Sequence, residues 1–142
     1  MTEPLILVVE DDSDDLALIM RALGRARVSN RVRVVRDGVE ACDYLLDGTA
    51  PLPELPIVVL LDVKLPRVDG LEVLQRIRGD ERTRTLPVVM LTSSDEQEDL
   101  LRSYSLGANS YVRKPVEFAQ FQEMIGQLGL YWVLINRTPR PA

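Results

Sequence analysis

The chain contains 142 residues with a formal net charge of −5, no histidine and a single cysteine. This length and an apolar content of 46% are typical of one globular domain, while the net negative charge disfavours nucleic acid as a partner. The missing histidine excludes histidine-based acid–base catalysis and histidine metal sites, and a lone cysteine excludes an internal disulfide, which fits a reducing cytoplasm.

Short apolar runs and helical spacing alternate along the chain. The apolar runs predict strands at 5–9, 32–35, 57–61, 88–91 and 110–112. Continuous Val, Ile and Leu runs of this length are typical of parallel strands buried on both faces of a sheet. Segments with helical spacing follow the strands, at 15–26, 38–46, 70–79, 95–107 and 117–135. This alternation predicts a three-layer α/β fold around a five-stranded parallel sheet, with no membrane span and no signal peptide.

The first helical segment shows the predicted pattern in detail. A polar cap is expected at its start, from Asp12 or Ser13. The apolar spacing places four residues on one face of this helix: Leu16, Ile19, Met20 and Leu23.

Polar residues stand where the predicted strands end. Glu10 and Asp11 follow the first strand, Asp62 follows the third, Thr92 the fourth and Lys114 the fifth. Because function gathers at the carboxyl ends of parallel strands, we expect these side chains to crowd one edge of the sheet. The sequence therefore predicts a site that combines carboxylates, a hydroxyl group and an ammonium group.

The expected chemistry of this edge is that of a hard cation and an anion together. Mg²⁺ prefers oxygen ligands, and crowded carboxylates repel one another unless a cation neutralises them. A carboxylate is also a known nucleophile toward phosphoryl groups, and phosphoryl transfer depends mainly on positioning and charge neutralisation. The simpler alternative, in which an acidic pair is only solvated or caps a helix, is less favoured once Asp62 joins the pair.

Four stretches of the chain resemble the motifs of receiver domains in two-component response regulators: ILVVEDD, LLDVKLPRVDG, VVMLTSS and SYVRKP. The resemblance covers about residues 4–128. It implies a flavodoxin/receiver-like (βα)5 fold, with residues 1–142 as a single receiver domain and 129–142 as a C-terminal extension.

The resemblance assigns roles to individual residues. It implies that Asp62 is the phosphorylated residue, and that Glu10, Asp11, Asp62 and the backbone carbonyl of Lys64 bind Mg²⁺ or Mn²⁺. It further implies that Thr92 and Lys114 act in phosphoryl transfer. In the same family Thr92 and Tyr111 would form a conformational switch, and Pro115 would follow a cis peptide bond.

A narrower resemblance is to the stand-alone regulators that serve bacterial phytochromes. Three stretches carry it, namely the insertion DGTAPLPELP, the segment SYSLGANSYVRKPV and the aromatic extension LYWVLI. It implies that a sensor histidine kinase, a bacteriophytochrome, donates the phosphoryl group from a phosphohistidine. The protein would then signal through protein contacts rather than DNA binding. It would be no enzyme beyond its own phosphorylation and dephosphorylation.

Two surfaces are expected to meet partners. By resemblance, the kinase would dock on the first helix and on the loop after Lys114, at Leu16, Met20, Pro115 and Val116. The apolar segment near the C-terminus predicts a symmetric homodimer, with Tyr131 and Trp132 as anchors.

One residue departs from the receiver pattern, and three other functions are compared with it. Many receivers have a small or amide residue where Lys64 stands, and its ammonium group predicts a longer-lived phosphoryl group. An aspartate-nucleophile phosphatase of the haloacid-dehalogenase type would need a second Asp at that position. A flavodoxin-like nucleotide binder would need a glycine-rich loop where this chain has VVEDDSDD. A receiver-like scaffold that is never phosphorylated stays open.

Overall fold

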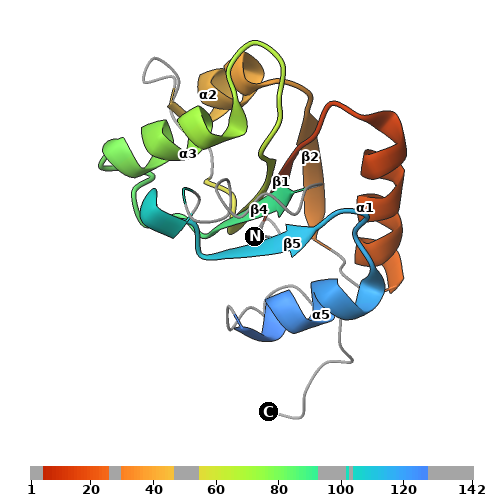
Figure 1. Ribbon diagram of the computed structural model, residues 1–142. Coiled ribbons are helices and arrows are strands. Elements are labelled where there is room, and N and C mark those ends of the chain that lie inside the picture. Colours follow the sequence, from red (N-terminus) through yellow and green to blue (C-terminus); the bar gives the residue numbers. More distant parts are fainter. Residues whose placement is uncertain (1–4, 26–29, 47–54, 93–101, 103, 128–142) are drawn as a thin grey trace.

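Five parallel strands form one sheet in the order β2-β1-β3-β4-β5 (Figure 1). The computed structural model describes residues 5–25, 30–46, 55–92, 102 and 104–127. The strands are β1 (Leu5–Val9), β2 (Arg31–Val35), β3 (Val58–Asp62), β4 (Val88–Thr92) and β5 (Ser110–Arg113). This confirms the parallel sheet and the flavodoxin/receiver-like topology, in which the strand order reverses between β1 and β3.

Helices cover both faces of the sheet and confirm the three layers. They are α1 (Ser13–Arg25), α2 (Gly38–Leu46), α3 (Gly70–Gly79) and α5 (Phe118–Gln127). α1 and α5 lie on one face, and α2 and α3 on the other (Figure 1). Most of the helix expected at 95–107, and residues 128–135 of the last expected helix, lie outside the described residues. Among the described helices, none has the length and apolar character needed to cross a membrane.

The core is divided in two by the sheet. Along β1, Ile6 and Val8 pack toward α1 and α5, while Leu7 and Val9 pack toward α2 and α3. This explains why the central strands have no polar face. The prediction that all five strands are buried on both faces is wrong for β2 and β5, which alternate between buried and more exposed residues because they lie at the edges of the sheet.

The start of α1 is fixed by a side-chain cap. Asp12 Oδ1 accepts a hydrogen bond from the backbone N–H of Asp15 at 2.9 Å, which confirms Asp12 as the cap and starts the helix at Ser13. The buried face consists of Ile19, Ala22 and Leu23. Met20, which the spacing groups with Ile19 and Leu23, is 41% exposed, and Ala22 packs on the buried face instead.

Arg78, in the last turn of α3, joins three segments at the amino ends of β4 and β5. Its guanidinium donates to the carbonyl of Leu86 at 2.8 Å, to the carbonyl of Gly107 at 2.9 Å and to Asn109 Oδ1 at 2.8 Å. Asn109 Oδ1 also accepts from the backbone N–H of Val88 at 2.8 Å. This network ties α3 to the chain just before each of the two strands.

Candidate functional site

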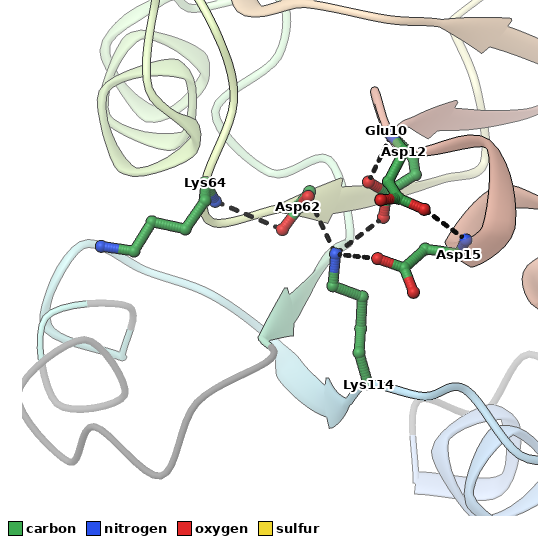
Figure 2. Close-up of polar contacts among 6 residues, drawn as sticks. All are labelled: Glu10, Asp12, Asp15, Asp62, Lys64 and Lys114. Carbon is green, nitrogen blue, oxygen red and sulfur yellow. Dashed lines mark hydrogen bonds and ion pairs between the residues drawn. The ribbon is translucent and has the colours of Figure 1, made fainter.

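The predicted site forms at the carboxyl edge of the sheet. Glu10 follows β1, Asp62 is the last residue of β3, and Lys114 follows β5. Figure 2 shows these side chains converging from different strands, with Asp15 of α1 reaching the same point. The structure therefore brings together the acidic residues, the predicted phosphoacceptor and the lysine, which lie far apart in the sequence.

Lys114 lies at the centre of this cluster. Its ammonium nitrogen is 3.1 Å from Glu10 Oε1, 2.9 Å from Asp15 Oδ2 and 3.0 Å from Asp62 Oδ2. The side chain is only 7% exposed. Burial alone would lower the pKa of Lys114, but the hydrogen bonds that its ammonium group donates to Asp15 and Asp62 outweigh burial and hold the pKa above its usual value. The ammonium group therefore stays charged at any physiological pH.

Asp62 is held through both carboxylate oxygens. Oδ1 accepts a hydrogen bond from the backbone N–H of Lys64 at 3.2 Å, and Oδ2 accepts from Lys114 at 3.0 Å. The side chain of Lys64 points away from the Asp62 carboxylate (Figure 2). In this arrangement the backbone of residue 64, rather than its ammonium group, is the part that contacts Asp62.

Glu10 is a buried carboxylate with an altered protonation equilibrium. It has no exposed surface, and its Oε2 accepts from the backbone N–H of Asp12 at 3.2 Å. Burial, together with the neighbouring Asp62 carboxyl group, raises the pKa of Glu10 to about 7. A cation at this point would relieve the repulsion between Glu10 and Asp62.

The donor set fits a hard divalent cation. Glu10, Asp11 and Asp62 each offer a carboxylate oxygen, and these atoms all lie within 4.8 Å of one another. Two of the residues are buried and Asp11 is exposed, so a metal would be reached from the open edge of the sheet. The family role of the Lys64 carbonyl as a further ligand stays a prediction.

Affinity for Mg²⁺ is expected to rise with pH. Because the pKa of Glu10 is raised to about 7, Mg²⁺ must displace a proton from Glu10 below that pH, whereas above it the carboxylate is already ionised. The dissociation constant should fall several-fold between about pH 6 and about pH 8. Calorimetric titration with Mg²⁺ across this range would measure it. A Glu10→Gln variant that kept the same pH dependence would contradict this origin.

The first turn of α3 packs directly beneath the end of β3. Asp69 caps the helix by accepting a hydrogen bond from the backbone N–H of Leu71 at 3.4 Å. A Cβ atom at Gly70 would lie 1.9 Å from the carbonyl oxygen of Asp62. Only glycine permits this approach, so Gly70 sets where the backbone of Asp62 lies.

A Gly70→Ala substitution is expected to lower the free energy of unfolding by about 2 kcal/mol or more, because the new methyl group overlaps backbone that cannot move independently. Urea unfolding would measure the change. Gly79→Ala is the matched control in the same helix, since nothing lies within 4 Å of a Cβ there, and it should be neutral or slightly stabilising. Equal stability of the two variants would contradict the argument.

The two predicted switch residues lie on neighbouring strands, Thr92 at the end of β4 and Tyr111 within β5. Thr92 is 7% exposed at the end of β4, and its carbonyl accepts from the backbone N–H of Lys114 at 2.6 Å. Tyr111 is 37% exposed and meets Tyr104 edge to face, with ring centroids 5.8 Å apart. Tyr111 is therefore turned outward in this structure, and the switch itself stays a prediction. The bond between Lys114 and Pro115 is cis, as the resemblance implied.

The residues predicted to contact partners differ in accessibility. Met20 and Pro115 are exposed, and Leu16 is partly buried. Val116 is 6% exposed and belongs to the core, so the predicted docking surface depends on the other three residues. The predicted dimer anchors Tyr131 and Trp132 lie outside the described residues.

Asp15 is the site residue that reasoning from the sequence missed. It makes the shortest of the three contacts to Lys114, although it belongs to a helix and not to a strand end. The available signal was the cap at Asp12, since it puts residue 15 in the first helical turn, close to the end of β1.

Comparison with known proteins gives one family. A model of the response regulator receiver domain matches residues 6–126, which include every strand end of the site. Among curated proteins, the probable methanogenesis regulatory protein FilR2 of Methanothrix harundinacea is 44% identical over 138 residues. That match covers 97% of this chain and 89% of FilR2.

Solved structures show the same likeness. The bacteriophytochrome response regulator AtBRR is 52% identical, with a TM-score of 0.82, and the match covers 96% of this chain and 100% of AtBRR. The phosphorylated cyanobacterial phytochrome response regulator RcpA is 34% identical, with a TM-score of 0.76, over 92% of this chain and 94% of RcpA. Sequence and fold therefore agree over nearly the whole chain.

Proposed function

Because this chain belongs to the family of response regulator receiver domains, we propose that it accepts a phosphoryl group on Asp62 from a phosphohistidine of a sensor histidine kinase in the cytoplasm. The observation that carries the proposal is the placement of Asp62. Its buried carboxylate lies 3.0 Å from the Lys114 ammonium group and within 4.8 Å of the carboxylates of Glu10 and Asp11. This is the arrangement that charge neutralisation during phosphoryl transfer requires.

The chemistry follows from the groups present. An Asp62 carboxylate oxygen attacks phosphorus and forms a P–O bond, while the P–N bond to the donor imidazole breaks and the imidazole keeps the electron pair. The hydrogen bond from the Lys64 backbone and the ion pair with Lys114 hold the carboxylate in one orientation. Lys114 also offsets negative charge on the phosphoryl oxygens, and bound Mg²⁺ or Mn²⁺, held by Glu10, Asp11 and Asp62, would supply further neutralising charge.

The proposed donor is a bacteriophytochrome. Support comes from similarity to AtBRR and RcpA, both of which are described as phytochrome response regulators. We place the kinase contact on α1 and on the turn after Lys114, where Met20 and Pro115 are exposed. The chemistry of the donor fits an acceptor chain that contains no histidine of its own.

The proposed output is a protein contact controlled by Thr92 and Tyr111. A phosphoryl group on Asp62 would offer a charged acceptor to the Thr92 hydroxyl, and the space that Thr92 leaves would admit the Tyr111 ring. The ring now packs on Tyr104, so this movement would change the surface around β5. We also propose a homodimer that uses Tyr131 and Trp132.

Intact mass after incubation with acetyl phosphate and Mg²⁺ tests the central step. The wild-type protein should gain a single phosphoryl adduct, and chelating the metal should prevent it, because uncompensated carboxylates repel the phosphate. Absence of the adduct, repeated with a purified bacteriophytochrome kinase as donor, would favour the alternative of an unphosphorylated scaffold.

A further inference from the structure

All three N–H bonds of the Lys114 ammonium group are directed at carboxylates. An ammonium group has three donors, and the structure gives Lys114 three acceptors, on Glu10, Asp15 and Asp62. A phosphoryl oxygen that arrives at Asp62 can therefore bond to Lys114 only if one of these contacts is given up.

The three acceptors differ in the free energy that is lost when their contact with Lys114 is broken. The Glu10 and Asp62 side chains are 0% and 4% exposed, so each would be left in a buried site without its counter-charge. The Asp15 side chain is 28% exposed, and water can replace the lysine there. In the metal-free site, release is therefore cheapest at Asp15.

Asp15 also stands apart from the candidate metal ligands. The oxygen atoms that could hold a cation belong to Glu10, Asp11 and Asp62, and among the described residues Asp15 is not part of that group. A cation bound there would supply counter-charge to Glu10 and Asp62, which leaves Asp15 as the carboxylate that still depends on Lys114. The Asp15 contact, at 2.9 Å, also contributes to the raised pKa of Lys114.

We propose that Asp15 is a positioning residue that competes with the phosphoryl group for the Lys114 ammonium group, and so limits how tightly the site holds phosphate on Asp62. The inference rests on the proposed function and deepens it. In the unphosphorylated protein Asp15 keeps Lys114 paired. In the phosphorylated protein a phosphoryl oxygen and Asp15 compete for the Lys114 ammonium group, with no covalent bond of Asp15 made or broken.

Removing the Asp15 charge should therefore strengthen the phosphorylated state. In Asp15→Asn, one N–H of Lys114 is more readily given to the incoming anion, and one negative charge near that anion is lost. Beryllofluoride, an anion that binds carboxylate oxygen in place of a phosphoryl group, should bind about threefold to tenfold more tightly than to wild type at saturating Mg²⁺. Fluorine NMR would measure the bound fraction directly.

Asp14→Asn is the matched control. Asp14 is the preceding residue, is exposed, and is not among the three partners of Lys114. It removes the same charge from the same helical turn and should change beryllofluoride affinity much less. Equal tightening in both variants would overturn the proposal in favour of a general charge effect, and unchanged or weaker binding by Asp15→Asn would overturn it outright.

Two further variants serve as controls for folding and for charge. Asp15→Ala, which suits a helix, should give the same tightening if Asp15→Asn folds poorly, and Asp15→Glu should return affinity toward wild type. A failure of the proposed function looks different, because wild-type protein would then bind no beryllofluoride and form no adduct. That outcome would contradict both the proposed phosphorylation of Asp62 and the role of Asp15. Binding by wild type without tighter binding by the Asp15 variants would contradict only the role of Asp15.

Discussion

Replacing Asp62 by Asn is expected to abolish the phosphoryl adduct that acetyl phosphate and Mg²⁺ form on the wild-type protein. The amide keeps the size of the side chain, and its one carbonyl oxygen can still accept from one of the two donors, the Lys64 backbone or Lys114. It is, however, a poor nucleophile and carries no charge for a cation. The loss should therefore be complete, with the fold retained, and intact mass together with circular dichroism would measure both.

The control for Asp62→Asn removes the same charge elsewhere. Asp43 is exposed on α2, outside the group of candidate metal ligands, and Asp43→Asn should be phosphorylated like wild type. An adduct that persists on Asp62→Asn would contradict the assignment of the acceptor. Peptide mapping would then decide whether Glu10 or Asp11 carries it.

Replacing Lys114 by Met is expected to lower the free energy of unfolding of the metal-free protein by about 3 kcal/mol. Methionine keeps most of the length of the side chain but removes the charge that faces Glu10, Asp15 and Asp62. Carboxylates left in a buried site without a counter-charge are costly, although protonation of Glu10 would relieve part of that cost. Urea unfolding in the presence of a chelator would measure the loss.

Added Mg²⁺ should stabilise Lys114→Met more than it stabilises wild type, because a cation replaces part of the missing charge. Lys64→Met is the matched control, since the Lys64 side chain is exposed and points away from Asp62 (Figure 2). Its free energy of unfolding should stay within about 0.5 kcal/mol of wild type. If Lys114→Met were as stable as Lys64→Met without metal, the ion pairs would contribute nothing to stability.

The strands and the residues at their ends could be predicted from the sequence for a physical reason. Central parallel strands are buried on both sides, so β1, β3 and β4 appear as unbroken apolar runs, and the first polar residue after each run marks the edge of the sheet. Glu10 and Asp62 were located in this way. Their roles came from the resemblance, which the family match over residues 6–126 confirms at the level of the family.

The features that the sequence did not predict depend on how elements are rotated and packed. The burial of Ala22 follows from the rotation of α1 about its own axis, which apolar spacing alone locates only approximately. The contact between Asp15 and Lys114 joins a helix to a loop 99 positions away, and no local pattern specifies such a pair. Gly70 likewise looks like an ordinary helix start until the carbonyl of Asp62 is placed beside it.

The Arg78 network anchors the amino ends of β4 and β5 to α3. At the amino ends of β4 and β5, one guanidinium group cross-links the carbonyls of Leu86 and Gly107 and the side chain of Asn109. At the opposite ends of the strands, Lys114 makes a second cross-link, to Glu10 after β1 and to Asp62 at the end of β3. Of these two anchors of β5 only Lys114 contacts Asp62, so we expect a change at Asp62 to act on the carboxyl end of β5 while Arg78 holds its amino end in place.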